Sequence, residues 1–355
     1  MLAASELARY IAVMRRPTRL GLAVIAALLV IASAYTAYWF VVASQIKDSV
    51  DAWAQSERAD KIDVSWQRIS ITGFPIAFRI ELDRAALRDN AVNPAPDLRI
   101  SSLSGTARPW DFADWHLHAP AGFSAELAGA GERAPAKLTA RSADGVVSIE
   151  TEGGWKLWLR LQDAAIETAD RVLISAADGW VIVPPKLPRN RIDPGLGLAW
   201  NLREVQLPVA IGPLGDTIEQ LDFDVTVKGG LPSGKLAQAV MAWRDAGGTI
   251  ELDNLDLRWG GLAAVATGTV ALDQDLQPIG GFSGAIQGYD KVLSALVQSG
   301  RMRAADAGLA RIALTMLAKA GPDGKPEIKT AFTIQNGQMF LGPAKLGKAP
   351  HFSWE

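Results

Sequence analysis

An uncharged, proline-free segment, residues 20–42 (LGLAVIAALLVIASAYTAYWFVV), constrains this chain more than any other feature. At a rise of about 1.5 Å per residue, a helix of this length crosses a ~30 Å hydrocarbon core. Four arginines and one glutamate precede the segment, whereas Lys47, Asp48 and Asp51 follow it. This basic bias predicts a single-pass anchor with residues 1–19 in the cytoplasm and the bulk of the chain exported.

A cleaved signal peptide is the alternative interpretation of the same segment. A basic region, an apolar run over residues 20–31 and the triplet Ala32-Ser33-Ala34 fit that pattern. The apolar run nevertheless continues past the triplet to Val42, over a full bilayer-spanning length. We therefore favour an uncleaved anchor over cleavage, and both interpretations export the remainder of the chain.

The chain contains no cysteine, which limits both the cellular compartment it suits and the kinds of chemical site it can form. Disulfides, thiolate nucleophiles and cysteine metal sites are excluded together, so the exported part must be held by its core. This composition favours a bacterial periplasm, which makes the membrane of the anchor the inner membrane. A net charge of −2, without a basic patch, argues against a nucleic-acid partner.

The pattern after the anchor changes from helical to strand-like. Ile46, Val50 and Trp53 keep helical spacing, which predicts a helical stalk over residues 43–62 that simply lifts the domain off the membrane. From Asp63 onward apolar and polar residues alternate, with slips near Gln67 and Asn254 that predict β-bulges.

This alternation predicts a mainly β (α+β) fold, in which large, twisted antiparallel sheets carry a few packing helices. We expect helices only near residues 235–246 and 289–320. The Pro-rich stretch at 184–194 suggests a boundary between two β-rich exported halves, residues 63–190 and 191–355.

No motif of a catalytic centre is found in the sequence. His116 and His118 would share one face of a strand, but a metal site needs three or four ligands and no third histidine is near. The patterns G-x-S-x-G and G-x-x-x-x-G-K-[ST] are both missing. We therefore predict a non-enzymatic protein with no cofactor, no metal and no catalytic residue.

Twelve tryptophans stand out in the composition, most of them in or beside predicted strands. Ordinary core packing explains most of them, since a sheet can also cover itself by folding into a sandwich. A sharper hypothesis is an open apolar groove that binds an acyl chain. The candidate groove residues are Trp66, Phe74, Phe78, Trp155, Phe223, Trp259 and Phe332.

Three stretches together resemble a known family. They are residues 65–82 with Arg108-Pro109-Trp110, residues 259–280, and residues 334–347. The combination is similar to domain of unknown function family 2125, membrane-anchored proteins of Gram-negative bacteria. The third stretch, N-G-x-x-x-L-G-P followed by L-G, also resembles more loosely the C-terminal end of AsmA-like proteins.

These resemblances imply a membrane-anchored, AsmA-like β-rich protein of the cell envelope. We expect it to bind lipid or to maintain the envelope and outer membrane. The alternative is a structural module that docks envelope proteins through a sheet edge. An envelope hydrolase is the third and least favoured option.

Overall fold

The computed structural model describes residues 3–59, 61–90, 95–127, 135–150, 153–186, 188–208, 214–232, 236–298, 300, 302–321, 324–342, 344–352 and 354. Side chains are described from Gly21 onward, without those of Leu296, Leu341 and residues 344–346.

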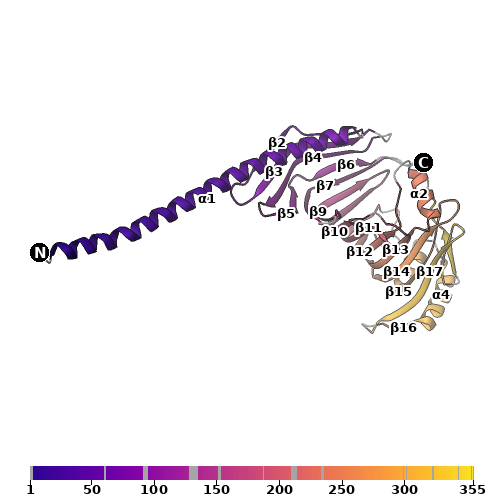
Figure 1. Cartoon of the computed structure of the whole chain (residues 1–355). Helices are drawn as coiled ribbons and strands as arrows, with labels where there is room; N and C mark the ends of the chain where they lie inside the picture. The colour runs from indigo at the N-terminus through magenta and orange to yellow at the C-terminus, as the bar shows by residue number, and fades with distance from the viewer. Residues whose placement is uncertain are drawn as a thin grey trace.

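Within these residues a long N-terminal helix precedes a large sheet with a few further helices (Figure 1). The helices are α1 (Ala3–Ala59), α2 (Leu236–Asp245), α3 (Tyr289–Gln298) and α4 (Ala304–Leu317). The strands of the first half are β1 (Ile62–Ser65), β2 (Arg68–Thr72), β3 (Phe78–Asp89), β4 (Asp97–Arg108), β5 (Asp111–Ala119), β6 (Phe123–Leu127), β7 (Ala136–Ala140), β8 (Ser142–Ile149), β9 (Trp155–Glu167) and β10 (Arg171–Val183). The strands of the second half are β11 (Pro194–Gln206), β12 (Thr217–Lys228), β13 (Thr249–Trp259), β14 (Leu262–Leu272), β15 (Pro278–Gln287), β16 (Lys319–Ala320), β17 (Pro326–Gln335), β18 (Gln338–Leu341) and β19 (Ala344–Lys348).

The strands form one continuous 19-stranded sheet in which the pairings are antiparallel. From β8 to β15 each strand pairs with the next one in sequence, as in a simple meander. Two short strands share one position where β5 and β6 both pair with β4, and again where β7 and β8 both pair with β9. At about 4.8 Å between neighbouring strands, the sheet extends on the order of 60 Å from β3 to β19.

The predicted fold class, a mainly antiparallel β structure after an N-terminal apolar helix, is confirmed. The bulge predicted near Asn254 is present, because the register of β13 shifts between Leu252 and Leu255. The helices expected near 235–246 and 289–320 correspond to α2 and to the pair α3 and α4. Lys235, where the first of these ranges begins, lies outside the described residues.

The Pro-rich stretch at 184–194 does not interrupt the sheet. It connects β10 to β11, and these strands pair from Leu173 with Gln206 to Ile182 with Gly197. The boundary predicted between residues 190 and 191 therefore falls in a strand connection inside one sheet. Proline is tolerated there because a connection has no ladder hydrogen bonds to lose.

The C-terminal part of α1 is not a free stalk, which corrects the expectation for residues 43–62. It lies along the first strands of the sheet (Figure 1), with Ala54 almost fully buried. Val50 and Trp53 of this part line an apolar cavity of about 160 Å³ together with Leu82 and Leu98. The helical spacing seen in the sequence therefore reflects packing against the sheet rather than an isolated stalk.

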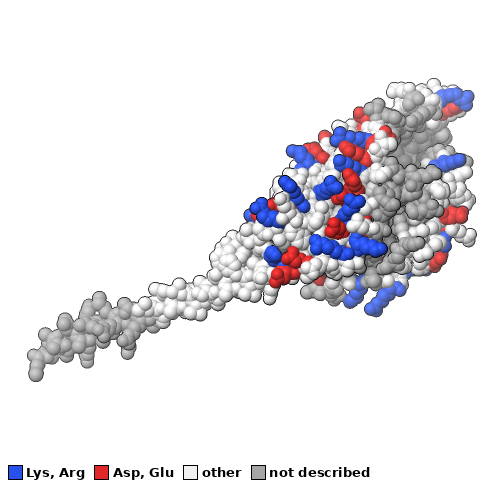
Figure 2. Space-filling model, turned by 90° about the horizontal axis from the view of Figure 1, so that it is seen from above, with Lys and Arg blue, Asp and Glu red and all other residues white. Residues whose placement is uncertain are grey.

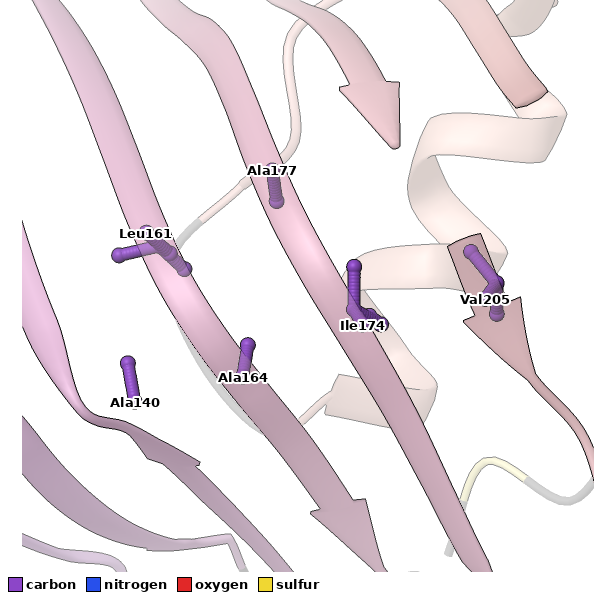
Figure 3. Packing of buried hydrophobic residues seen from close by; sticks show 6 residues of the cluster. All are labelled: Ala140, Leu161, Ala164, Ile174, Ala177 and Val205. Atoms are coloured by element: carbon purple, nitrogen blue, oxygen red, sulfur yellow. The ribbon is translucent and has the colours of Figure 1, made fainter. Parts of the chain in front are cut away.

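A crease crosses the sheet at one register position, which recurs in three strands that are not direct neighbours. Arg84 in β3, Asp163 in β9 and Glu204 in β11 all have positive φ, between 45° and 51°. The buried cluster Ala140, Leu161, Ala164, Ile174, Ala177 and Val205 surrounds this line in β7 and β9–β11 (Figure 3). The crease thus bends the sheet and seals part of its apolar side.

Glu204 allows a test of whether the backbone is strained at the crease. Its φ of 51° is unfavourable for residues other than glycine. We expect Glu204→Gly to raise the free energy of unfolding by about 1 kcal/mol, whereas Glu204→Val should lower it by about 1–2 kcal/mol. Urea denaturation of both variants in detergent measures the difference. Equal stability of the glycine and valine variants would contradict a strained bend at this position.

Candidate functional site

One row of residues runs across the whole sheet at a single register, and we refer to it as the central ladder. It begins beside α1 in β2 and ends in β17. Apart from the last member it consists of apolar residues and glycines. In order it comprises Ile71, Ile80, Gly105, Leu117, Gly145, Leu159, Gly179, Trp200, Phe223, Leu255, Ala266, Gly284 and Thr330.

Glycines in the central ladder make room for the large side chains beside them. A Cβ atom built at Gly179 would lie 2.5 Å from the ring of Trp200, which is closer than carbon atoms approach. At Gly145 the corresponding distance to Leu159 Cδ2 is 3.1 Å. The large side chains therefore lie flat across their neighbours, so the surface of the ladder is continuous from strand to strand.

Two further ladders flank the central ladder on the same side of the sheet. The first comprises Trp115, Val147, Leu157, Val181, Leu198, Val225, Leu252, Gly268, Phe282 and Phe332. The second comprises Ala119, Ala143, Leu161, Ala177, Leu202, Leu221, Leu257, Ala264, Ile286 and Ile328. We refer to the side of the sheet that carries these three ladders as the apolar face.

The apolar face is only partly covered within the described part of the chain. Phe78 is the one large side chain there with less than 2% of its surface exposed. Trp200, Phe223 and Leu255 are half-buried, although they lie in the middle of the sheet. In a closed sandwich such central side chains would be sealed, so this side of the sheet remains accessible between the crease and the strand ends.

The seven residues predicted to line a groove take different positions. Phe223 belongs to the central ladder and Phe332 to a flanking ladder, while Trp155 and Trp259 follow the same alternation at the ends of β9 and β13. Trp66 lines the cavity beneath α1. The structure therefore brings these four onto one face, and Phe78, two residues before Ile80 of the central ladder, makes a fifth.

The remaining two residues, Phe74 and Phe78, surround Trp39 of α1. The Phe78 ring stacks on Trp39 with 5.0 Å between centroids, and Phe78 is completely buried. Its prediction as an open groove residue is wrong, because α1 covers it. Phe74 lies in the β2–β3 turn with its ring edge-on to Trp39 at 5.6 Å.

The opposite face of the sheet is polar at the register next to the central ladder. This row comprises Ser70, Glu81, Ser104, His118, Asp144, Arg160, Asp178, Asn201, Asp222 and Asp256. Arg203 pairs with Asp222 on this face, and that carboxylate raises the arginine pKa through the hydrogen bond between them. On the side of the sheet domain that faces the viewer in Figure 2, charges of both signs are interspersed, whereas the white part of α1 shows none.

His116 and His118 lie on this polar face, in a hollow that Glu81 and Asp144 also line. His118 Nδ1 lies 2.6 Å from Asp144 Oδ1, and both side chains are exposed. Ser104 is next to His118 in register, but its hydroxyl donates to the His118 backbone carbonyl at 3.5 Å rather than to the imidazole. Among the described residues no group of three or more histidines or carboxylates could hold a metal ion.

Asp224, on the polar face, makes the stability of the folded state depend on pH. Although the side chain reaches solvent, desolvation by the neighbouring strands raises its pKa above 3.8, and nearby Asp253 adds to the rise. The folded state therefore binds this proton more tightly than the unfolded state, so stability falls as pH rises through the raised pKa.

We accordingly expect Asp224→Asn to raise the thermal midpoint at pH 7, because the variant lacks a charge that is desolvated by the neighbouring strands and repelled by Asp253. The gain should disappear below about pH 3.8, where the native carboxyl is also neutral. Thermal scans at several pH values measure this, with Asp170→Asn in the β9–β10 turn as a control for charge loss. If the thermal midpoint of the variant stayed higher in acid, the effect would come from the asparagine amide and not from the loss of the Asp224 charge.

Comparison with known proteins identifies the family of the chain. The family described as "Uncharacterized protein conserved in bacteria (DUF2125)" matches residues 39–350, which is most of the chain. The chain belongs to the DUF2125 family. The match begins at Trp39, so in this DUF2125 chain it includes most of the part of α1 that packs on the sheet and all 19 strands.

No curated protein and no solved structure matches the chain significantly. The looser resemblance to AsmA-like proteins therefore stays a prediction for this DUF2125 member. The feature that the sequence analysis missed is the alignment of the ladders. Alternation within each strand is visible in the sequence, whereas the glycines opposite large residues, which are the one signal for register, carried no prediction.

Proposed function

We propose that this protein is held in the inner membrane by α1, with its N-terminus in the cytoplasm and the sheet in the periplasm, and that the apolar face binds lipid acyl chains. α1 is a single helix of sufficient length and apolarity to cross a membrane, with a mean hydropathy of 2.0 in its apolar window. Leu22, Leu28 and Val30 of this segment are largely exposed, as lipid-facing side chains would be.

The observation that carries the proposal is the length and continuity of the apolar face. Three adjacent ladders, without a charged residue in any of them, reach from β5 near the anchor to β17. Apolar surface of this extent on a soluble domain needs an occupant, and an extended acyl chain fits a long, flat apolar surface. A lipid would lie along the ladders while its headgroup stays in water.

The role we propose is non-enzymatic, namely lipid binding in the service of envelope or outer-membrane maintenance. Binding by this face needs no cofactor, because apolar contact alone supplies about 25 cal/mol per Å² of buried apolar surface. The exposed His118–Asp144 pair supports the less favoured hydrolase alternative only weakly, since Ser104 does not donate to the imidazole.

Photo-crosslinking in cells tests the proposal with positional resolution. Benzoylphenylalanine placed at Phe223, in the central ladder, should crosslink to phospholipid or another acyl lipid, detected by mass spectrometry of the labelled peptide. The same group at Val265, on the polar face and 48% exposed, is the control and should give no lipid adduct. Adduct-free protein at both positions would overturn lipid binding by the apolar face.

A specific feature favours the alternative of a protein interaction module. Leu309, Ile312, Met316 and Leu317 form an exposed apolar stripe on α4, at the end of the sheet away from the anchor. An amphipathic helix with its apolar stripe uncovered is typical of helix-mediated docking. Protein crosslinks from Ile312, together with no lipid at Phe223, would support this alternative.

A further inference from the structure

Two loops at one end of the sheet contact the anchor helix within its uncharged segment. We refer to residues 73–77, between β2 and β3, and residues 109–110, between β4 and β5, as the anchor-side loops. The Tyr35 hydroxyl donates a hydrogen bond to the Pro75 carbonyl, and the Tyr38 hydroxyl donates to the Pro109 carbonyl at 2.9 Å. Each loop is therefore held to α1 by a hydrogen bond to its backbone.

A third hydrogen bond and a set of ring contacts make this attachment rigid. Trp39 Nε1 donates to the Ala77 carbonyl at 3.1 Å, and its ring contacts Phe74 edge-on and stacks on Phe78. Phe40 stacks on Phe74 with 6.0 Å between the ring centroids. Trp39 and Phe78 are buried by these contacts, so the loops cannot leave α1 without exposing two large aromatic side chains.

The position of the contacts along α1 fixes the depth of the loops. Tyr35 and Trp39 lie about 22 Å and 28 Å along the helix from Leu20, at 1.5 Å per residue. Both distances fall within a ~30 Å hydrocarbon core that begins at Leu20. If the segment spans the membrane, the loops bound to it lie at the level of the outer hydrocarbon layer rather than in the periplasm.

The composition of the anchor-side loops fits that depth. Neither loop contains a charged residue, and Ile76 and Trp110 are 70% and 69% exposed. Charged residues flank the loops: Arg79 follows the first loop, and Arg108 and Asp111 lie on either side of the second. Exposed isoleucine and tryptophan beside flanking arginines are the composition of a segment that dips into the acyl layer while its charges stay at the level of the headgroups.

We propose that the anchor-side loops insert into the outer leaflet of the membrane next to α1, so that the apolar face begins inside the bilayer. The occupant of this surface is the phospholipid layer itself, because the loops continue the surface of the spanning helix. The inference rests on the proposed anchor. It deepens the proposed function, since an acyl chain could move from the leaflet to the ladders without crossing water.

The natural absence of cysteine allows a direct test with single spin labels on the full chain in phospholipid vesicles. Labels at Ile76→Cys and Trp110→Cys report on the loops, and Leu28→Cys reports on the anchor. Ile192→Cys, 68% exposed in the β10–β11 connection, is the matched water-exposed control. Collisions with oxygen, which partitions into lipid, are compared with collisions with a water-soluble nickel chelate.

We expect labels at 28, 76 and 110 to gain collisions with oxygen and to lose those with nickel, and the label at 192 to do the reverse. Lipid exposure at 28 with water exposure at both 76 and 110 would overturn loop insertion and leave the anchor standing. Water exposure at 28 would overturn the anchor and the inference together. If the label at 192 were exposed to lipid as well, the whole domain would adsorb to the membrane, and the proposal that only the two loops insert would be overturned.

Discussion

Val225→Arg is expected to lower lipid crosslinking at Phe223 by more than about tenfold, which corresponds to at least 1.4 kcal/mol of binding free energy. Val225 lies in a flanking ladder between Leu198 and Leu252, and it is half-buried. A guanidinium at this position would have to lose water whenever an acyl chain covered it. That desolvation opposes binding at the middle of the apolar face without removing any strand hydrogen bond.

Val265→Arg is the matched control for this prediction. It makes the same substitution two strands away, but on the polar face, where Asp256 is the register neighbour of Val265. We expect crosslinking at Phe223 to be unchanged, and circular dichroism to show both variants folded with similar thermal midpoints. Equal crosslinking in the two variants would contradict binding by the apolar face, and equal loss in both would indicate a general effect of charge.

Phe78→Ala is expected to reduce the free energy of unfolding by about 3–5 kcal/mol. Phe78 is fully buried, and it stacks on Trp39 at 5.0 Å and on Phe112 at 5.6 Å. Truncation leaves a cavity where α1 meets β3, so the surrounding rings lose contacts that they cannot recover by small movements. Urea unfolding of the full chain in detergent, followed by tryptophan fluorescence, measures the loss.

Phe74→Ala separates burial from aromatic contact in the same cluster. Phe74 also contacts Trp39, but it is 46% exposed. We expect this variant to lose only about 1 kcal/mol, because much of the side chain is in water in the folded state too. If the two variants lost similar stability, the attachment of α1 would depend on ring contacts in general rather than on the sealed position of Phe78.

The sequence by itself determined features that depend on local spacing. A helix rises by a fixed length per residue, so the length of the uncharged segment was enough to predict that α1 could cross a membrane. Side chains alternate across a strand, so period two was enough to predict strands such as β9 and β12 and a mainly antiparallel sheet. The short helices followed from apolar spacing in the same way.

Only the tertiary structure decided which residues from different strands become neighbours. The central ladder requires Gly179 to lie between Leu159 and Trp200, and a register change by one residue would move each side chain to the other face. Phe78 was predicted to be open because nothing in its strand indicates that Trp39, 39 positions earlier, covers it. Contacts between distant segments leave no periodic signal in one sequence.

The crease illustrates the same limit at the level of the backbone. Positive φ values are expected at glycine, yet the chain bends at Arg84, Asp163 and Glu204, whose side chains give no local indication of it. Asp163 and Glu204 lie at one register position on either side of β10, so the pairing of the strands brings these two bends into line. The sequence thus predicted a helix long and apolar enough to cross a membrane, the strands and their apolar sides. The packing of the whole sheet decided which part of that apolar surface is sealed and which part remains accessible.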